Sequence, residues 1–404
     1  MGVQPPKGPV AVSSAGPPLS VGGVDPERGF AGGETQVLGL TRALLGMGHR
    51  AELLCDPEGE LWRRARAGGI VCHPLPIRNA LDFAAAAKLR AILRRERYDV
   101  VHFHTARAHA LAPWARGRAR AAIVTRRMDY APNRLFARWL FGSAVDGVAA
   151  ISGGVADALA RAGVPRERIV VIPSGVDCAH FRPPQAAERA AARAALGLEG
   201  ADCAIGAIGA LEPRKGHRFL LEAIARMRRG DTAAAQSAAA HLAPRPVAII
   251  AGDGSLRRAL ADDIRRLGLE GAVRMLGQVE DARPILWALD AVAMPSLMEG
   301  LGVAMLEAMA CGLAVVASRV GGIVDAIDDD RDGMLVEPAN GAALARALAH
   351  LCADSRARLA LGAAARAIAL ERFSIETMAL RTVELYRACL QTDASARALG
   401  AQGI

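Results

Sequence analysis

The stretch from Pro295 to Gly322 constrains the fold of this chain more than any other. A short apolar segment, 291–294, precedes a tight loop at 296–302, and an apolar helix of about three turns follows, which Gly312 ends. A second apolar segment occupies 313–317. Two apolar strands joined through a helix form a parallel crossover, because parallel strands need a long connection. The sequence therefore predicts an α/β fold built on parallel sheets.

Polar groups interrupt this apolar stretch in the loop and on the helix. Glu299 lies in the loop, and Glu307 follows eight positions later on the helix. Gly300 and Gly302, on either side of Leu301, leave backbone amides accessible at the start of the helix, which suits a phosphate. Ligands of open α/β sheets bind at the carboxyl ends of the strands. Two carboxylates that accept hydroxyl groups, with free amides between them, indicate a pocket for a sugar nucleotide.

The string EGLGVAMLEAMACGLAVVAS closely resembles the E-x7-E signature of retaining GT-B glycosyltransferases of family 4. The resemblance implies two Rossmann-like parallel-sheet domains that face each other across a cleft, with a C-terminal helix that crosses back to the first domain. It also implies that Glu299 faces the donor sugar and that Glu307 holds the nucleotide ribose. The loop residues Gly300, Leu301 and Gly302 are then donor-binding.

Two motifs in the first half of the chain resemble segments of the same family. The glycine pair Gly32 and Gly33, which resembles the family's G-G-x-E motif, is expected to line the cleft, and the V-H-x-H motif is expected to bring His104 to the donor sugar. His102 is expected to be a packed core histidine, and His109 is expected on a helix surface.

The second half carries the expected phosphate site. Arg214 and Lys215 lie in a loop between a strand and a helix, and cations fixed there can stabilise a departing diphosphate. The resemblance maps Lys215 onto the lysine of a G-R-L-x-x-x-K-G motif, while the motif arginine is replaced by Ala210. Arg214 is a candidate to take the place of that arginine. The G-x-G loop at Gly252 and Gly254 is expected near the nucleotide.

Composition and motif positions divide the chain into four parts. Residues 1–20 are proline-rich and are expected to be a disordered lead. Residues 21–180 form an N-terminal Rossmann-like domain on the acceptor side, and 181–372 form the C-terminal domain that binds the nucleotide sugar. Residues 373–404 form the crossing helix and a tail. The first strand is expected at 19–24, although two glycines interrupt it.

The net charge of +9 lies entirely in the first half of the chain. Residues 1–180 hold 24 Lys and Arg against 15 Asp and Glu, whereas 181–404 hold 26 of each. Such asymmetry indicates an anionic partner or a solvated arginine-rich face. The basic helix expected at 81–97 is a candidate for peripheral contact with an anionic membrane. Arg126, Arg127 and Arg134 form a candidate acceptor surface. Aromatic residues make up only 4% of the chain, which argues against a nucleic-acid partner.

The cysteine pattern bears on compartment and on metals. Seven scattered cysteines without a C-x-x-C motif predict reduced thiols and no zinc site. The sequence shows neither a signal peptide nor an apolar run long enough to span a bilayer, so a cytoplasmic protein is expected, possibly at the inner face of the membrane. The resemblance implies a metal-independent enzyme without a cofactor, whose donor is a substrate.

These residues lead to one functional hypothesis and to its rivals. The expected activity is transfer of a hexose-like sugar from a nucleotide-diphosphate donor to a hydroxyl acceptor with retention of configuration, in envelope polysaccharide or lipopolysaccharide biosynthesis. Catalytic roles fall to Glu299, His104 and Lys215. A non-catalytic GT-B relative that binds sugar nucleotides is the alternative. A nucleotide-sugar 2-epimerase and a nucleic-acid binder are less favoured by the motifs.

Overall fold

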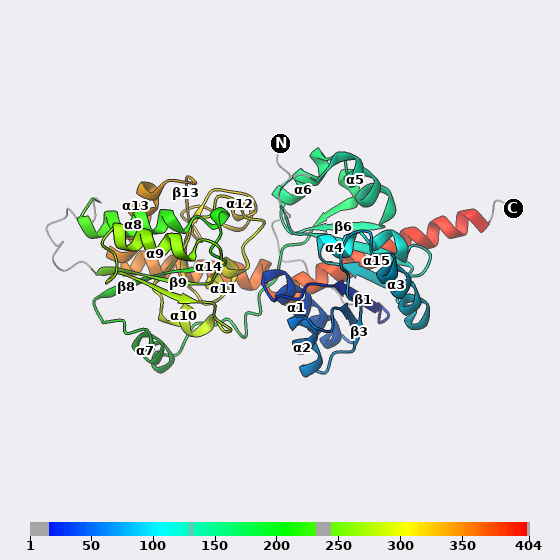
Figure 1. Cartoon of the computed structure of the whole chain (residues 1–404), viewed down its shortest axis with the longest axis horizontal. Coiled ribbons are helices and arrows are strands. Elements are labelled where there is room, and N and C mark those ends of the chain that lie inside the picture. Colours follow the sequence, from blue (N-terminus) through cyan, green and yellow to red (C-terminus); the bar gives the residue numbers. More distant parts are fainter. Residues whose placement is uncertain (1–15, 129, 131, 232–243, 402–404) are drawn as a thin grey trace. The chain divides into compact units, whose positions relative to one another are not determined.

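The computed structural model describes residues 16–128, 130, 132–231 and 244–401, and it divides into two compact units (Figure 1). Unit 1 comprises residues 1–151, 156–175 and 374–404, and unit 2 comprises 152–155 and 176–373. The domain boundaries predicted at 180/181 and 372/373 lie within a few residues of this division. Most of the predicted disordered lead lies outside the described residues, but at its end Leu19 is buried and Ser20 begins the first strand.

Unit 1 is built on a seven-stranded sheet in the order β3-β2-β1-β4-β5-β6-β7, with every pair parallel. The strands are β1 (Ser20–Asp25), β2 (Arg50–Cys55), β3 (Cys72–Pro74), β4 (Val100–Phe103), β5 (Ala121–Arg126), β6 (Gly147–Ala150) and β7 (Ile169–Val171). The first strand forms despite its two glycines, because β1 lies between β2 and β4 and is buried by them. The strand order reverses between β1 and β4, which makes that edge the expected ligand edge.

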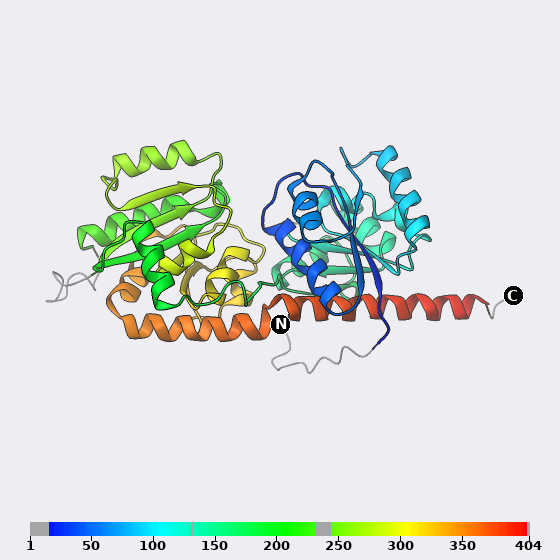
Figure 2. The ribbon, with the colours of Figure 1, turned by 90° about the horizontal axis from the view of Figure 1, so that it is seen from below.

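Helices cover both faces of this sheet. They are α1 (Gly32–Gly46), α2 (Glu60–Ala67), α3 (Phe83–Glu96), α4 (Ala106–His109), α5 (Arg134–Trp139), α6 (Gly153–Arg161), whose first turn belongs to unit 2, and α15 (Ile375–Ala401), with short turns η1 (Ala112–Ala115), η2 (Leu140–Ala144) and η3 (Arg166–Arg168). The long helix α15 packs against α1, β5 and β6 (Figure 2). Its residue Tyr386 is fully buried in the same apolar cluster as Leu44 of α1 and Ile123 of β5.

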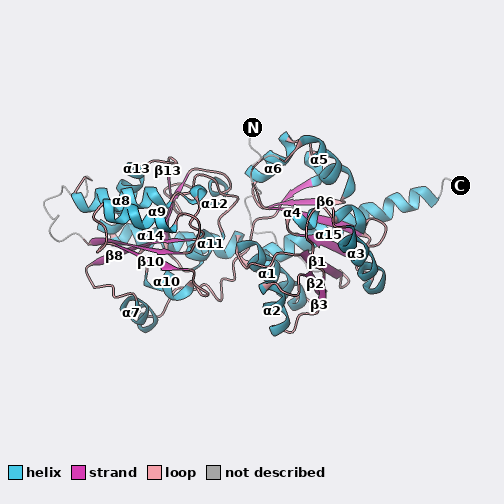
Figure 3. Cartoon of the chain, in the orientation of Figure 1, coloured by secondary structure: helices cyan, strands magenta, loops and turns pink. Residues whose placement is uncertain are grey.

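Unit 2 is built on a six-stranded parallel sheet in the order β10-β9-β8-β11-β12-β13 (Figure 3). The strands are β8 (Asp202–Ile208), β9 (Arg245–Ala251), β10 (Val273–Gly277), β11 (Ala291–Met294), β12 (Ala314–Ser318) and β13 (Met334–Val336). This is the strand order of a dinucleotide-binding Rossmann fold, with its reversal between β8 and β11. The predicted α/β class with two Rossmann-like parallel sheets is confirmed.

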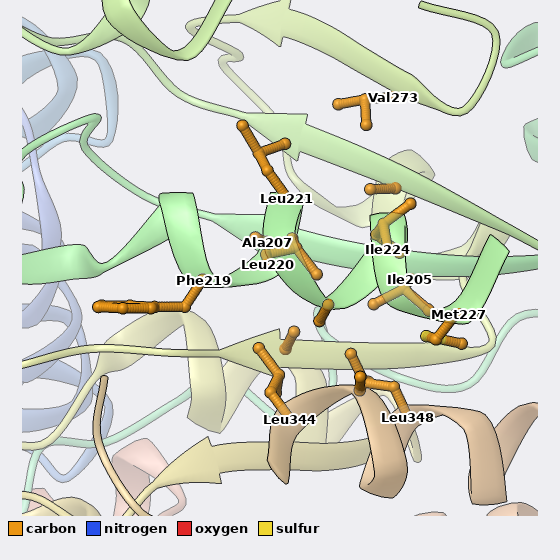
Figure 4. Close-up of a cluster of buried hydrophobic side chains, with 14 of the residues drawn as sticks. Ile205, Ala207, Phe219, Leu220, Leu221, Ile224, Met227, Val273, Leu344 and Leu348 are labelled. Carbon is orange, nitrogen blue, oxygen red and sulfur yellow. The ribbon is translucent and has the colours of Figure 1, made fainter. Parts of the chain in front are cut away.

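The helices of unit 2 pack in two layers. One layer holds α8 (His217–Arg229), α9 (Arg257–Arg266) and α13 (Gly341–Ala353), and the other holds α7 (Ala186–Ala195), α10 (Arg283–Ala288), α11 (Val303–Ala310) and α14 (Ser355–Arg372), with short turns η4 (Pro213–Lys215) and α12 (Ile323–Ala326). Figure 4 shows the core under α8, where Leu220 and Ile224 face Ile205 of β8 and Leu348 of α13. The same core fixes the loops that follow β8 and β11.

The helix of the key stretch is shorter than predicted. It begins at Val303, directly after the predicted loop, because Gly302 has a left-handed backbone with φ of 84° and does not continue a helix. The eight residues of α11 therefore make about two turns, not three. Gly312 has φ of 76° just beyond the helix end, as its predicted role as a stop requires.

The prediction of reduced cysteines is wrong for two of the seven. Cys203 at the start of β8 and Cys352 in α13 form a disulfide, with their Cα atoms 5.7 Å apart. They are 149 residues apart in sequence and meet only because α13 packs over β8 in the core of unit 2. The other five cysteines are buried. Among the described residues, no helix has the length and apolar character that a membrane crossing demands.

Candidate functional site

Lys215 and Glu299 meet at the carboxyl ends of the two strands where the sheet of unit 2 reverses its order. Lys215 follows β8 and Glu299 follows β11, and the Lys215 Nζ lies 2.5 Å from the Glu299 Oε2. Their side chains are only 14% and 9% exposed. Ser296 also donates to the Glu299 carboxylate, at 3.4 Å. The structure thus brings together, in one half-buried site, the predicted phosphate-binding cation and the predicted sugar-binding carboxylate.

Bare backbone amides lie beside this ion pair. Gly300, Leu301 and Gly302 precede α11, and within the described chain their N–H groups donate no hydrogen bond. Gly300 is held by the close approach of Gly322, whose N–H donates to the Glu299 carbonyl at 3.0 Å. Free amides at the start of a helix carry a partial positive charge that favours an anion. The predicted donor loop therefore has the groups that a diphosphate needs.

The glycines after β9 bring a neighbouring backbone close to this site. Gly252 has φ of 145°, and a Cβ atom there would lie 1.9 Å from the carbonyl oxygen of Gly209. Gly254 is similarly close to Leu211, whose N–H donates to the Asp253 carbonyl at 2.9 Å. Only glycine allows such an approach. The two predicted donor-binding glycines therefore hold the loop after β8, on which Lys215 stands.

Glu307 lies on α11, half-buried, and faces Asp281 of the loop after β10. Burial, with the negative charge of Asp281 as the smaller contribution, raises the pKa of Glu307 to about 8. A carboxyl with this pKa holds its proton at neutral pH, so it can donate a hydrogen bond as well as accept one. Both abilities suit the two hydroxyl groups of a ribose.

The raised pKa of Glu307 predicts a pH-dependent loss of stability. A carboxyl whose pKa is higher in the folded state stabilises the fold at low pH, and this contribution is lost as the pH rises through about 8. Glu307→Gln cannot ionise, so we expect the variant to gain stability relative to the wild type between about pH 5 and pH 8.5. Urea unfolding at several pH values measures the difference. A stability difference that stays constant over this range would contradict the raised pKa.

Arg214 is paired with a different carboxylate from Lys215. Its guanidinium forms an ion pair with Glu212 at 2.7 Å, and both side chains are more than a third exposed. The carbonyl of Arg214 accepts the N–H of Leu297 at 2.7 Å, which ties the loop after β8 to the loop after β11. To replace the arginine that is missing at Ala210, Arg214 would have to leave Glu212.

The predicted histidines of unit 1 are His102, within β4, and His104, just after it, and both lie in a buried polar cluster. Both ring nitrogens of His102 have partners at 2.7 Å, the hydroxyl groups of Tyr386 and Thr125, so it is the satisfied core histidine that the sequence predicts. His104 is buried, and its Nδ1 has no hydrogen-bond partner among the described residues. Burial holds the pKa of His104 well below its ordinary value, so the ring is neutral. A cavity of about 20 Å³, lined in part by His104 and Arg127, has room for a single water-sized group.

Sequence reasoning missed Asp25 at the end of β1. It is 1% exposed, and its Oδ2 has no hydrogen-bond partner among the described residues. Burial and the charge of Glu34 raise its pKa to about 7, while Arg127 acts in the opposite direction. The predicted Gly33 lies beside Arg127, because a Cβ atom there would be 4.0 Å from the Arg127 Cδ. Asp25, Gly33, His104 and Arg127 thus converge where β1, β4 and β5 end, and a polar residue directly after a strand was the signal.

The predicted acceptor arginines do not form one surface. Arg127 is part of the cluster just described, and burial lowers its pKa. Arg126 is buried and donates to the Tyr130 carbonyl at 3.1 Å, whereas Arg134 is exposed at the start of α5. The expectation for His109 is wrong: its ring is buried and contacts the Thr125 carbonyl at 3.0 Å, because α4 packs onto β5.

One further group has a spacing that a metal ion could use. The side chains of Glu52, His73 and Glu96 approach one another within 4.8 Å. Arg50 bonds to both glutamates, and Tyr98 also donates to Glu52 at 2.6 Å. The Arg50 guanidinium already balances the negative charge of the two glutamates, so these residues form a structural network.

Two family models match the chain, one in its first half and one in its second half. The Glycosyltransferase Family 4 model matches residues 30–180, and the Glycosyl transferases group 1 model matches residues 202–354. A D-inositol 3-phosphate glycosyltransferase of Saccharomonospora viridis is 35% identical over 228 residues, which is 55% of this chain and 50% of that protein. An alpha-maltose-1-phosphate synthase of Mycolicibacterium smegmatis is 29% identical over 381 residues, 83% of this chain and 91% of that protein. For the D-inositol 3-phosphate glycosyltransferases, which are the first relatives it matches, the chain spans only about half of their length.

Solved structures share the whole fold. The crystal structure of HepE of Anabaena in complex with UDP superposes with a TM-score of 0.79 at 23% identity, covering 92% of this chain and all of that one. A glycosyltransferase of Rickettsia africae gives a TM-score of 0.80 at 20% identity, covering 92% of this chain and 99% of that one. The two units are therefore the two halves of a GT-B fold. With each half matched by its own family model, the chain belongs to glycosyltransferase family 4, among the glycosyl transferases of group 1.

Proposed function

We propose that this protein transfers a sugar from a nucleotide-diphosphate sugar to a hydroxyl acceptor, with retention of configuration at the anomeric carbon. The observation that carries the proposal is the contact between Lys215 and Glu299 at the strand-order reversal of unit 2. Family membership supports the reaction class. The UDP bound in the Anabaena structure supports a nucleotide-diphosphate donor.

Each group of unit 2 then has a role toward the donor. The Lys215 ammonium has three N–H donors. One is hydrogen-bonded to Glu299, so the other two can reach a diphosphate. The bare amides of Gly300, Leu301 and Gly302 can donate hydrogen bonds to oxygens of the same phosphates. Glu299 holds hydroxyl groups of the sugar, and Glu307 holds the ribose. The donor is a substrate, and the proposal needs no metal and no cofactor.

The chemical step requires no protein nucleophile. The bond between the anomeric carbon and the phosphate oxygen breaks, and a bond to the acceptor oxygen forms on the same face of the sugar. The acceptor proton passes to the departing phosphate oxygen. Lys215 and the loop amides stabilise the charge that develops on the diphosphate, which is the part of such catalysis that a protein supplies through fixed dipoles and cations.

The acceptor is proposed to bind to unit 1. Asp25, His104 and Arg127 offer a carboxyl with a pKa of about 7, a neutral imidazole and a cation, and each has one buried polar atom without a hydrogen-bond partner among the described residues. This set suits a polyol that carries an anionic group. The curated relatives named above act on or make a sugar or inositol phosphate, which favours a small phosphorylated polyol over the envelope polysaccharide expected from sequence. Cytoplasmic location stays a prediction.

A ligand screen followed by product analysis tests the proposal. We expect UDP, or another nucleoside diphosphate, to raise the melting temperature, because a ligand that binds only the folded state stabilises it. Donors that pass the screen are incubated with D-inositol 3-phosphate and with glycan acceptors, and products are identified by mass and by anomeric NMR. Binding without any transfer or donor hydrolysis would favour the non-catalytic alternative. Failure of every nucleotide sugar to bind would overturn the proposal.

A further inference from the structure

The short helix α5 of unit 1 presents its large apolar side chains to solvent. Leu135 is 81% exposed, Trp139 is 52% exposed and Phe136 is 43% exposed. Leu135 and Trp139 are four positions apart, which places them on one face of the helix. The Phe136 ring lies 6.2 Å from the Trp139 ring, so the exposed groups are contiguous. Scattered apolar residues are ordinary on a surface, but a contiguous patch indicates an interaction site.

The patch also has exposed neighbours and a firm base. Met128 and Tyr130, just before the helix, are 41% and 49% exposed. Ala137 of α5 and Phe141 of η2 are buried beneath it. Phe136 contacts Phe141 edge to face, with the ring centroids 6.4 Å apart. Because its inner side is anchored in the core, α5 holds the apolar side chains outward.

The charge around the patch has one sign. Between residues 100 and 145 the sequence has eight arginines and a single acidic residue, Asp129. Arg134 and Arg138 are exposed on α5 itself, and within the described chain neither forms an ion pair. Exposed apolar and aromatic side chains beside these two arginines match the chemistry of an interfacial membrane helix, whose apolar side enters the headgroup region while its cations meet lipid phosphates.

We propose that α5 docks unit 1 onto an anionic lipid bilayer surface. Three arguments favour a bilayer over other partners. A second copy of the chain would place arginine against arginine in a symmetric interface. A nucleic acid would gain little from Leu135, the most exposed apolar side chain of the patch, which cannot stack on a base. An anionic bilayer satisfies the apolar and the cationic groups together. The proposal does not depend on the glycosyl transfer reaction.

The basic helix α3, which the sequence favours for membrane contact, is the weaker candidate. Its exposed apolar residues, Leu81 and Phe83, lie only at its start. Arg95 forms an ion pair with Glu96 and also contacts His73, so part of its basic face is already neutralised. The structure therefore moves the expected membrane contact from α3 to α5.

Co-sedimentation of the full chain with vesicles tests the proposal. We expect binding to vesicles of phosphatidylglycerol and phosphatidylcholine, and much weaker binding to phosphatidylcholine alone. The double variant Leu135→Glu/Trp139→Glu should bind the anionic vesicles at least about 10-fold more weakly, because two apolar groups are removed from the interface. Arg134→Gln/Arg138→Gln should also weaken this binding by about 10-fold or more, and should leave binding to phosphatidylcholine unchanged. The chain has four tryptophans, so the fluorescence change on vesicle binding is compared between the wild type and Trp139→Phe, and the difference reports insertion of Trp139.

Matched controls separate α5 from general basic charge. Leu359→Glu changes a leucine of unit 2 that is 69% exposed, and Leu81→Glu changes one of unit 1 that is 76% exposed. Both should bind vesicles as the wild type does. All replaced side chains are exposed, so thermal unfolding should stay within a few degrees of the wild type. Wild-type protein that does not sediment with anionic vesicles would overturn the proposal, as would wild-type binding by the α5 variants or equal loss in the Leu81 variant.

Discussion

Replacing Lys215 with alanine should lower the rate of sugar transfer by about 100- to 1,000-fold, the range seen when one group that stabilises developing negative charge is removed from an active site. The ammonium of Lys215 lies 2.5 Å from Glu299, and no other cation contacts that carboxylate among the described residues. The loss should appear in kcat, because the charge on the leaving diphosphate develops in the transition state. Steady-state kinetics with the donor identified by the ligand screen measures it.

Removing Lys215 should also destabilise unit 2. The Glu299 carboxylate is 9% exposed, and without its partner it becomes a buried unpaired charge, which costs about 3 kcal/mol or more. The double variant Lys215→Met/Glu299→Gln removes both charges, so it should recover most of this stability while it stays inactive. Lys88→Ala, at an exposed position of α3, is the matched control. Full activity in Lys215→Ala would refute the proposed role of the lysine, and equal stability of the single and double variants would refute the coupling.

Replacing Gly252 with alanine should destabilise unit 2 by about 3 kcal/mol or more, since the new methyl group collides with backbone. The Cβ atom would lie 1.9 Å from the Gly209 carbonyl oxygen, and φ of 145° is strained for any residue with a side chain. The loops after β8 and β9 would have to separate, although the Gly209 N–H donates to the Ala251 carbonyl at 2.9 Å. We therefore also expect weaker binding of a nucleoside diphosphate. Urea unfolding and a UDP thermal shift measure the two effects.

Gly271→Ala provides the comparison within the same unit. No atom lies within 4 Å of a Cβ atom at this exposed position, and its φ is outside the left-handed range. This variant should change the free energy of unfolding by less than about 0.5 kcal/mol. If both alanine variants have the same stability, the close approach at Gly252 does not constrain the loops as described.

The sequence predicted the architecture because parallel strands buried on both faces are continuous apolar runs. Residues 291–294 and 313–317 could be assigned in this way, and the family signature placed the loop between them. The helix length could not be obtained from the same letters. Val303 continues the apolar pattern of the stretch, but the conformation of Gly302 ends the loop, and conformation at a glycine is set by what packs against it.

The pairing of Lys215 with Glu299 was predicted only through the resemblance. The two residues are 84 positions apart, and nothing in their spacing shows that β8 and β11 are neighbours. The disulfide between Cys203 and Cys352 escaped for the same reason, since widely separated cysteines give no local signal. Asp25 follows the predicted first strand directly, which was a local signal, but the burial of its Oδ2 without a partner appears only once the chain is packed.

The return of the chain to unit 1 at Ser374 has a practical consequence for engineering. Tyr386 of α15 completes the hydrogen bonding of His102, and its neighbours on the helix close the apolar cluster beside β5 and β6. A fragment truncated after 175 would therefore expose the apolar residues that α15 covers. It would also remove the Tyr386 hydroxyl that bonds to the buried His102 Nδ1. Chimaeras that exchange donor preference between relatives need two splice junctions, so that the terminal helix travels with the half it completes.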